Sequence, residues 1–232
     1  MKTEVVQQIT NKPERKSLYH FTRVVNLPSI ADLDTLFASH VIHPNPEGER
    51  RTEKEVHLKN GNEVILNAHL KISTEMMDPD TTVGQFRSFL DQHVFLWPTL
   101  RLCKQMLHMY SRREPCEKFA ILQFDAYPLL FDHFDQIYLS KYDAGSMPRY
   151  PKRTSYRKTI RMFLPLDEYR KRVDSLVPRI PSQIHEIMIH NSVLSLHSYL
   201  QAVYCAEISD VPKSWAPLHR PLRYIESPTA QV

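Results

Sequence analysis

The chain has 232 residues, 42% of them apolar and 24% charged, which is ordinary for a globular protein of one large or two small domains. Its four glycines are too scattered to build the phosphate-binding loops of P-loop and dinucleotide-binding proteins, so those classes are nearly excluded. The three cysteines form no Cys-x-x-Cys pair, and the histidines show no His-Glu-x-x-His spacing. We therefore expect neither a disulfide framework nor a metal site.

Residues 1–16 are polar and lack the apolar core of a signal peptide, and no stretch of the chain has the length of a membrane span. We therefore expect a cytoplasmic protein with no membrane partner. Residues 1–16 are expected to be a flexible arm. Residues 17–210 are expected to form one domain, and residues 211–232 a proline-rich tail.

The first half of the chain predicts a strand, a helix and a hairpin, in that order. Leu18–Thr22 is typical of a buried strand, and polar capping residues near position 26 predict a helix that runs to about residue 39. Residues 43–54 predict a loop. Asn60-Gly61 between two short apolar runs is the strongest short hairpin signal, with strands at 56–58 and 64–66.

The second half alternates short strands and helices without a repeated β-α-β unit, which favours an α+β fold over a doubly wound parallel sheet. Apolar side chains at helical spacing predict a helix over residues 99–113. The basic segment 141–161 lacks a clean periodicity and predicts a long loop. The other expected elements are helices at 83–92 and 167–176, strands at 93–97, 118–124, 137–140, 160–164 and 184–190, then a short helix and a last strand near residue 204.

Glu186 lies inside the apolar strand Ile184–His190. Burying a carboxylate costs several kcal/mol unless it is paired or lines a wet cleft. The alternation of strand side chains puts Glu186 and Met188 on one face and Ile187 on the other. One interpretation is a carboxylate that lines a pocket, and the other is an edge-strand glutamate that faces water.

His20 and Thr22 pose the same question on the first strand, where both lie on one face between apolar neighbours. They either bind a polar ligand together, or the histidine is an ordinary core residue with its hydrogen bonds satisfied. Phe95 and Trp97 share a face of the later strand. They either form an aromatic wall that stacks a planar ring or belong to the core.

The segment Lys141–Arg161 carries seven basic residues and one acid, a charge of +6 in a chain whose net charge is +4. Tyrosines are interleaved with these cations, and this mixture suits single-stranded nucleic acid, whose bases stack and whose phosphates pair. The alternative is a basic surface loop that binds a protein or nothing. The residues predicted to contact nucleic acid are Arg149, Lys152, Arg153, Tyr156, Arg157 and Lys158.

The segment LYHFTRVVNLPSI, residues 18–30, resembles the opening of the DarT-type ADP-ribosyltransferases, toxins that modify single-stranded DNA. HVFLWP, followed by Arg101, is similar to the aromatic strand of that family, and IHEIMI is similar to the strand that holds its catalytic glutamate. YLSKYDAGS also resembles part of an uncharacterised bacterial domain family of the same superfamily. The resemblance runs from about residue 17 to residue 206 in short blocks.

The resemblance implies an ADP-ribosyltransferase-like split β-sandwich with flanking helices, in which two small sheets enclose a cleft that holds NAD as co-substrate. By carry-over, His20 binds the adenosine-side ribose, Thr22 helps to seat NAD, and Asn26 lies near the cleft. Phe95 and Trp97 border the nicotinamide.

The resemblance also implies the catalytic residues. Glu186 grips the nicotinamide ribose and supports a transition state with positive charge on the sugar. An arginine from a second region serves catalysis. Arg51 is predicted for this role, with Arg50 close behind, because spacing does not separate them.

The resulting prediction is a NAD-dependent ADP-ribosyltransferase toxin that modifies RNA or single-stranded DNA, as a phage-defence or toxin–antitoxin effector with an antitoxin protein as partner. One alternative is an RNA 2′-phosphotransferase-like enzyme of the same fold, which needs more arginines in its cleft motifs than this chain offers. The other is a catalytically inactive module that binds nucleic acid or protein. The effect of replacing Glu186 discriminates between the enzyme and the binding module.

Overall fold

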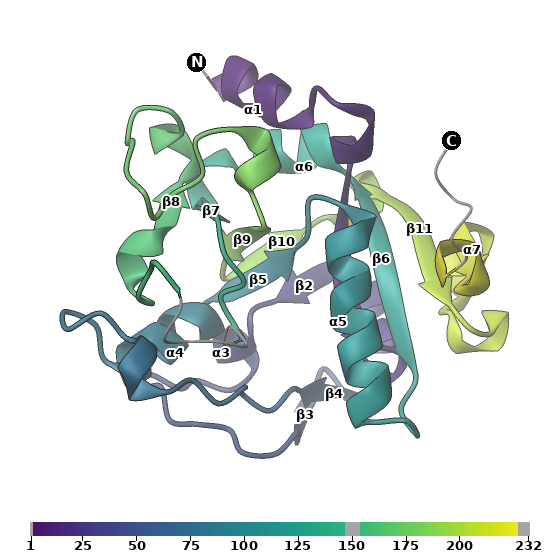
Figure 1. Cartoon of the computed structure of the whole chain (residues 1–232). Coiled ribbons are helices and arrows are strands. Elements are labelled where there is room, and N and C mark those ends of the chain that lie inside the picture. The colour runs from purple at the N-terminus through teal and green to yellow at the C-terminus, as the bar shows by residue number, and fades with distance from the viewer. Residues whose placement is uncertain (1, 147–153, 227–232) are drawn as a thin grey trace.

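Two four-stranded sheets form the frame of the molecule (Figure 1). The computed structural model describes residues 2–146 and 154–226 of the chain. Paired strands are antiparallel, except that β11 and β12 are parallel. The first sheet has the order β1-β6-β11-β12, with the bounds Ser17–Arg23, Phe119–Asp125, Leu200–Cys205 and His219–Pro221. The second sheet has the order β5-β9-β7-β8, with the bounds His93–Leu96, Glu186–His190, Ile137–Ser140 and Phe163–Pro165.

The two sheets are joined through their edge strands β1 and β5 by a single residue pair. The backbone N–H of Tyr19 donates to the carbonyl of Trp97 at 3.0 Å, and the N–H of Trp97 donates back at 2.8 Å. This antiparallel bridge is isolated, so the pairing does not continue along the two strands. The described structure is thus a mixed α+β fold, as predicted, in which the two sheets pair at one residue and share one apolar core.

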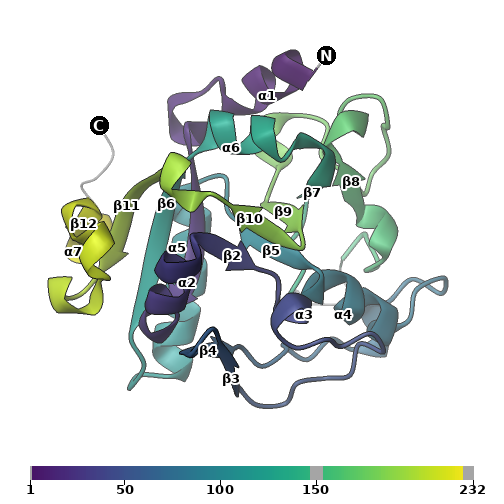
Figure 2. The same cartoon turned by 180° about the vertical axis from the view of Figure 1, so that it is seen from behind.

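The remaining strands in the described residues form two small sheets, which are visible from behind in Figure 2. β2, Thr35–Phe37, pairs with β10, Ser192–Leu194. β3, Glu55–Lys59, and β4, Asn62–Leu66, form the predicted hairpin. Asn60 and Gly61 at its turn have φ angles of 50° and 83°, the left-handed conformation that Asn-Gly adopts readily.

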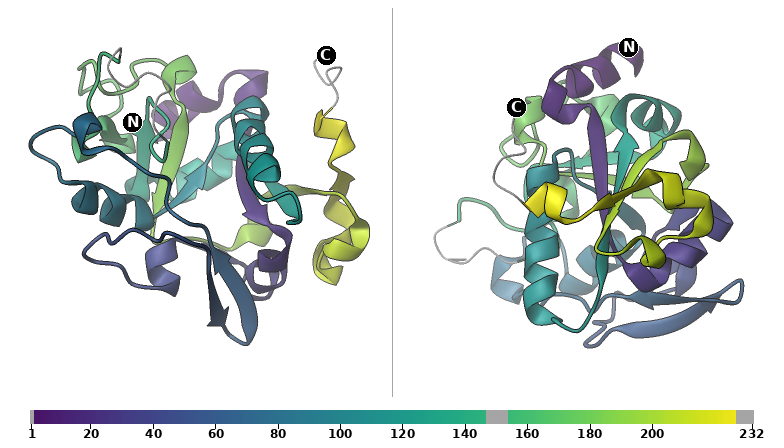
Figure 3. Two further views of the ribbon diagram at one scale, coloured as in Figure 1. Left: turned by 60° about the horizontal axis from the view of Figure 1, so that its bottom comes forward. Right: turned by 90° about the vertical axis from the view of Figure 1, so that its right-hand side faces the viewer.

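Helices cover both sheets. α5 packs against β1 and β6, whereas the C-terminal helix α7 lies beside β12 at the other edge of the same sheet (Figure 3). Ile225 of α7 joins the apolar cluster of α5. The expected helix 99–113 is confirmed, with Thr99 as its cap. The helices are α1 Lys2–Thr10, α2 Leu27–Leu33, α3 Ser39–Ile42, α4 Val83–Asp91, α5 Leu100–Arg113, α6 Ala126–Asp132 and α7 Arg223–Glu226.

The N-terminal segment is not a flexible arm, which corrects the prediction for residues 1–16. Residues 2–10 form α1, and Val5, Val6 and Ile9 belong to the main core, against α6. These three residues recur at helical spacing, so one face of α1 is apolar. At the other end of the chain, the expected tail supplies β12, α7 and the buried Trp215, and residues 227–232 lie outside the described residues.

Three other predicted elements differ. The helix expected over 26–39 stops at Leu33, because Asp34 adopts a left-handed φ of 49° and the chain continues as β2. The helix expected over 167–176 is reduced to a 3₁₀ turn at 166–168, since Arg170 has a φ of 67°. The strand expected over 160–164 begins only at Phe163, after a 3₁₀ turn.

The alternation predicted for the strand around Glu186 is confirmed. Ile187 and Ile189 of β9 belong to the main apolar core, whereas Met188 belongs to a separate cluster on the other face. Glu186, which shares the face of Met188, is buried with 4% exposure. The strand is therefore buried on both faces, and the interpretation of Glu186 as an edge-strand residue in water is wrong.

Candidate functional site

A cavity of about 280 Å³ lies beside β1 and β5. Its lining comes from β1, β5, β9, α4 and the loop before β3. Seven of the residues predicted for cofactor binding and catalysis line it: His20, Thr22, Asn26, Arg51, Phe95, Trp97 and Glu186. The fold therefore gathers residues that are far apart in the sequence around one hollow.

Glu186 is the first residue of β9 and points into this cavity from a buried position. The backbone N–H of Ala144 donates to its Oε2 at 2.9 Å. Burial raises the pKa of the Glu186 carboxyl well above its usual range, and the nearby Asp143 adds to this effect. The hydrogen bond from Ala144 and the charge of Lys158 lower the pKa but do not compensate. The surroundings of Glu186 in the free protein thus disfavour its ionised form.

Lys158 lies beneath the same turn and is fully buried. Its Nζ donates to the carbonyls of Asp143 at 3.0 Å and Ala144 at 2.7 Å, so the ammonium group fixes the turn that contacts Glu186. Burial lowers the pKa of Lys158 to about 8. A lysine in this position is not available to a nucleic acid on the surface, which corrects the prediction for Lys158.

His20 reaches across the gap between the two sheets. Its Nδ1 lies 2.9 Å from the carbonyl oxygen of Phe95. Because a carbonyl can only accept a hydrogen bond, Nδ1 carries the ring proton and Nε2 is an acceptor. Burial lowers the pKa of His20 to about 4, although this hydrogen bond raises it. The imidazole is therefore neutral at physiological pH.

Thr22 and Asn26 line the cavity on the side of β4. The amide of Asn26 donates to the carbonyl of Ile65 at 3.1 Å and accepts from the N–H of Ile65 at 2.8 Å. Asn26 thus pairs with β4 as a neighbouring strand would. Thr22 Oγ1 lies 3.5 Å from the Asn26 Nδ2, at the limit of a hydrogen bond.

Phe95 and Trp97 form the aromatic part of the lining. Phe95 is half-buried and packs against two apolar clusters, while Trp97 is 6% exposed and packs in the cluster of Phe21. Both rings therefore belong partly to the core and also border the cavity. The two interpretations given for this pair are compatible.

Arg51 is held rigidly at the cavity by Asp91. Its Nη1 donates to Oδ2 of Asp91 at 3.0 Å and its Nη2 to Oδ1 at 2.7 Å, and both side chains are buried. His69 Nε2 contacts Oδ1 of Asp91 at 2.9 Å, and the backbone N–H of Arg51 donates to His69 Nδ1 at 3.0 Å. Burial would raise the pKa of Asp91, but the hydrogen bonds from His69 and Arg51 outweigh it and hold that pKa well below its usual range.

Arg50, in contrast, is exposed and is not part of the lining. Its guanidinium reaches the carbonyl of His69 only at 3.5 Å. Sequence spacing does not show which of the two adjacent arginines is functional. In the structure, Arg51 lines the cavity and Arg50 does not.

Sequence reasoning missed several residues of the lining, notably His69, Asp91, His93 and Asp143. His93 Nδ1 lies 2.6 Å from the carbonyl of Phe89, while its Nε2 is buried without a partner among the described residues. Burial lowers the pKa of His93 to about 4. One sequence feature could have indicated two of these residues. Asp91 and His93 are polar residues among apolar ones, at the junction of α4 and β5.

The predicted nucleic-acid residues are only partly placed. Arg149, Lys152 and Arg153 lie outside the described residues. Arg157 is exposed, and the half-buried Tyr156 stacks on Tyr142 with ring centroids 3.9 Å apart.

Comparison with known proteins identifies the family. Residues 16–200 match DUF7002, described as a family of unknown function, and the chain belongs to this family. Two similar solved structures are Thermus sp. 2.9 DarT in complex with NAD+ and the same protein in complex with carba-NAD+. The first has a TM-score of 0.40 and 14% identity and covers 90% of this chain and 94% of that chain. The second has a TM-score of 0.40 and 15% identity and covers 90% and 95%.

A search of curated proteins gave no match. Among the described residues, no helix combines the length and the apolar character needed to cross a bilayer.

Proposed function

We propose that the chain is a NAD-dependent ADP-ribosyltransferase that transfers ADP-ribose to nucleic acid. The observation that carries the proposal is that His20 on β1 and Glu186 on β9, which are distant in sequence, line the same cavity. These two residues belong to two of the segments that resemble the DarT-type enzymes, 18–30 and IHEIMI. A buried acid and a neutral imidazole at one hollow fit the two sides of a bound dinucleotide.

The cavity lining offers groups for both ends of NAD. Its volume of about 280 Å³ is just below the range of small-molecule sites, roughly 300–1,000 Å³, so it encloses part of the dinucleotide. Phe95 and Trp97 offer aromatic surface for a planar ring. His20 offers Nε2 as an acceptor for a ribose hydroxyl, and Thr22 offers a hydroxyl group. The rest of the dinucleotide extends from the mouth of the cavity.

Glu186 is the proposed catalytic residue. When bound, NAD supplies a ribose–nicotinamide bond whose cleavage builds positive charge on the sugar. A Glu186 carboxylate beside the sugar stabilises that charge strongly, because the site is shielded from water. A cationic nicotinamide ring near Glu186 also favours the ionised form that burial disfavours. Binding of NAD and ionisation of Glu186 are therefore coupled.

Arg51 is proposed to bind the anionic part of NAD. It donates its Nε–H to the carbonyl of Asn67 at 3.3 Å and uses one N–H on each Nη for Asp91. A guanidinium has five N–H donors, so two remain for a phosphate oxygen. Asp91 fixes the plane of the group in advance of binding.

The proposed acceptor is RNA or single-stranded DNA. Without the buried Lys158, the segment from Lys141 to Arg161 has six basic residues and one acid, a charge of +5 that supports this acceptor. Asp143 and Gly145 of the same segment line the cavity, so nucleic acid bound next to them lies beside the reacting sugar. A role as a toxin or phage-defence effector, with a neutralising antitoxin protein as partner, belongs to the same proposal.

The test is incubation of the whole chain with NAD labelled in its adenylate part, in parallel with RNA, single-stranded DNA and total protein. We expect label on nucleic acid and release of nicotinamide. Glu186→Gln is expected to abolish both, whereas Glu207→Gln, which alters an exposed glutamate, leaves both unchanged. Label on protein alone overturns the acceptor. NAD turnover that is absent, or unaffected by Glu186→Gln, overturns the enzyme and favours the binding module.

A further inference from the structure

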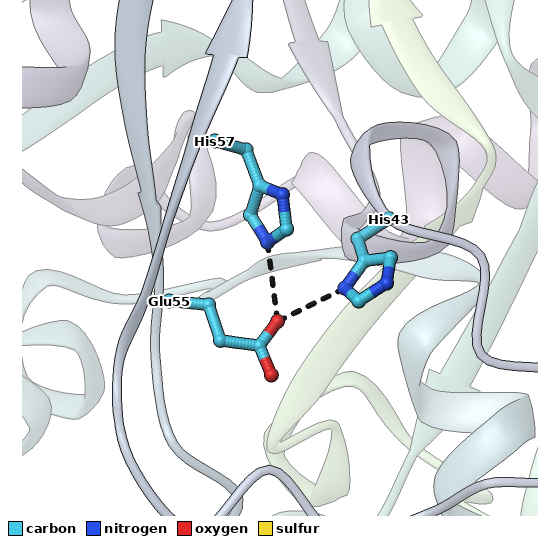
Figure 4. A group of neighbouring side chains, drawn as sticks. All are labelled: His43, Glu55 and His57. Atoms are coloured by element: carbon cyan, nitrogen blue, oxygen red, sulfur yellow. Dashed lines mark hydrogen bonds and ion pairs between the residues drawn. The ribbon is translucent and has the colours of Figure 1, made fainter.

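Three side chains of types that commonly bind metals, His43, Glu55 and His57, lie close together outside the cavity, at the base of hairpin β3–β4 (Figure 4). Oε2 of Glu55 lies 3.0 Å from Nδ1 of His43 and 3.1 Å from Nε2 of His57. The three ligand atoms all lie within 4.8 Å of one another. Figure 4 shows both imidazole rings directed at the same carboxylate oxygen.

The local structure explains why these side chains converge. Glu55 and His57 are alternate residues of β3 and therefore share a face of the strand. Val56 and Leu58, on the opposite face, are 58% and 74% exposed. His43 caps the C-terminus of α3, where its N–H donates to the carbonyl of Ser39 at 2.8 Å, and this cap sets the direction of its ring.

The donor set is chemically suited to a divalent transition-metal ion. Two imidazole nitrogens and one carboxylate oxygen, with a water in the fourth position, form a common tetrahedral Zn²⁺ site. Metal–ligand bonds of about 2.0–2.1 Å at tetrahedral angles put neighbouring ligand atoms roughly 3.3 Å apart. The two oxygen–nitrogen distances in this cluster are therefore already close to those of a metal site. Its single negative charge also complements a dication.

We propose that His43, Glu55 and His57 bind a divalent transition-metal ion such as Zn²⁺, which closes the loop of residues 44–54. This loop carries Arg51, the arginine of the cavity lining. His43 and Glu55 are the two ends of the loop. The ion thus joins the end of α3 to β3 and limits the freedom of the segment that positions Arg51.

This site is not apparent from the sequence, because its ligands show none of the short histidine spacings that mark metal motifs. The proposal is also independent of the reaction at the cavity. None of the three ligands lines that cavity, so metal binding at this site can be tested in the absence of NAD.

Titration calorimetry with Zn²⁺ tests the site on the whole untagged chain. Cys116 is exposed and is first replaced by serine to remove a competing thiol. We expect one Zn²⁺ per chain. His43→Ala and His57→Ala are each expected to weaken binding at least about tenfold, a loss that even outer partners of metal ligands produce. Since His43 is 50% exposed, its replacement leaves the core intact.

His197→Ala is the matched control. His197 is also an exposed histidine beside a carboxylate, that of Asp34, and its removal is expected to leave Zn²⁺ binding unchanged. Hydrogen exchange gives a second measurement: Zn²⁺ is expected to slow exchange in residues 44–54 of the parent chain but not of His43→Ala. No binding to the parent chain, or equal binding to His43→Ala and His57→Ala, overturns the proposal.

Discussion

Arg51 and Asp91, forty residues apart in the chain, form a bidentate ion pair that is buried on both sides. The oxygens of Asp91 also accept hydrogen bonds from Ser39 Oγ at 2.8 Å and Asn45 Nδ2 at 3.0 Å. The Asp91 carboxylate, at the end of α4, is therefore hydrogen-bonded to α3 and to the loop before β3. Removing its charge leaves the guanidinium of Arg51 buried without compensation.

Asp91→Asn is expected to lower the free energy of unfolding by about 3–5 kcal/mol, the usual cost of breaking one side of a buried ion pair. Urea unfolding measures this. Asp78→Asn is the control, because Asp78 pairs with an Arg161 side chain that is 59% exposed, and an exposed pair contributes less than about 1 kcal/mol. Equal effects of the two substitutions contradict the central role given to Asp91.

Acidification tests the same ion pair. The pKa of Asp91 lies below its usual range, so its contribution to stability is present above the pKa of the unfolded chain, about 3.9, and is lost as the pH falls through the folded value. Wild-type protein is therefore expected to lose stability more steeply below pH 4 than Asp91→Asn. Unfolding curves at several acidic pH values measure this difference. Parallel curves for both proteins count against it.

Glu186→Gln is expected to lower NAD turnover at least about 100-fold and, at the same time, to stabilise the protein. Glutamine keeps an acceptor for the N–H of Ala144 while removing a carboxyl whose charge is disfavoured by burial. The expected gain is about 0.5–2 kcal/mol at neutral pH, seen as a higher Tm. A variant less stable than wild type argues against the raised pKa.

The stability gain of Glu186→Gln is expected to depend on pH. A raised carboxyl pKa means that the unfolded chain ionises first, above about 4.5, while the folded protein stays neutral. Wild-type stability relative to Glu186→Gln therefore falls as the pH rises from 4.5 to the folded pKa, and then levels off. Thermal unfolding of both proteins across this range measures the trend, and a constant difference speaks against it.

His20 is expected to stay neutral, with its proton on Nδ1, from pH 8 down to about 5. Its pKa is about 4, because burial opposes the charged form. Nitrogen-detected NMR of the imidazole groups reports both the tautomer and the charge. The unfolded chain protonates near 6.5, so stability is lost as the pH falls from 6.5 towards 4. A His20 signal that titrates near 6.5 contradicts the buried position.

Several elements could be predicted from local pattern. The strand around His20, the Asn60-Gly61 hairpin and the strand that contains Glu186 follow from side-chain alternation and turn chemistry, and all three are present. The N-terminal helix was missed even though Val5, Val6 and Ile9 carry a helical pattern, because its polar neighbours dominated the interpretation.

Other features depend on contacts that local pattern does not contain. Arg50 and Arg51 are adjacent and alike, and only the position of Asp91 decides which of them lines the cavity. Lys158 looks like part of a basic surface segment, yet two backbone carbonyls receive its ammonium group in the interior. Asp34, whose left-handed φ ends α2 early, also accepts the N–H of His197 at 2.8 Å, a partner 163 residues further along the chain.

The bridge between Tyr19 and Trp97 fixes the relative position of the residues beside it on the two sheets. Among the described residues, this pair supplies the main-chain connection between the two four-stranded sheets. Side chains of both sheets, such as Leu122 and Ile187, also pack in one apolar core, so the bridge is held from that side as well. His20 follows Tyr19 directly and Phe95 lies two residues before Trp97, so the bridge sets the separation across which His20 bonds to the carbonyl of Phe95.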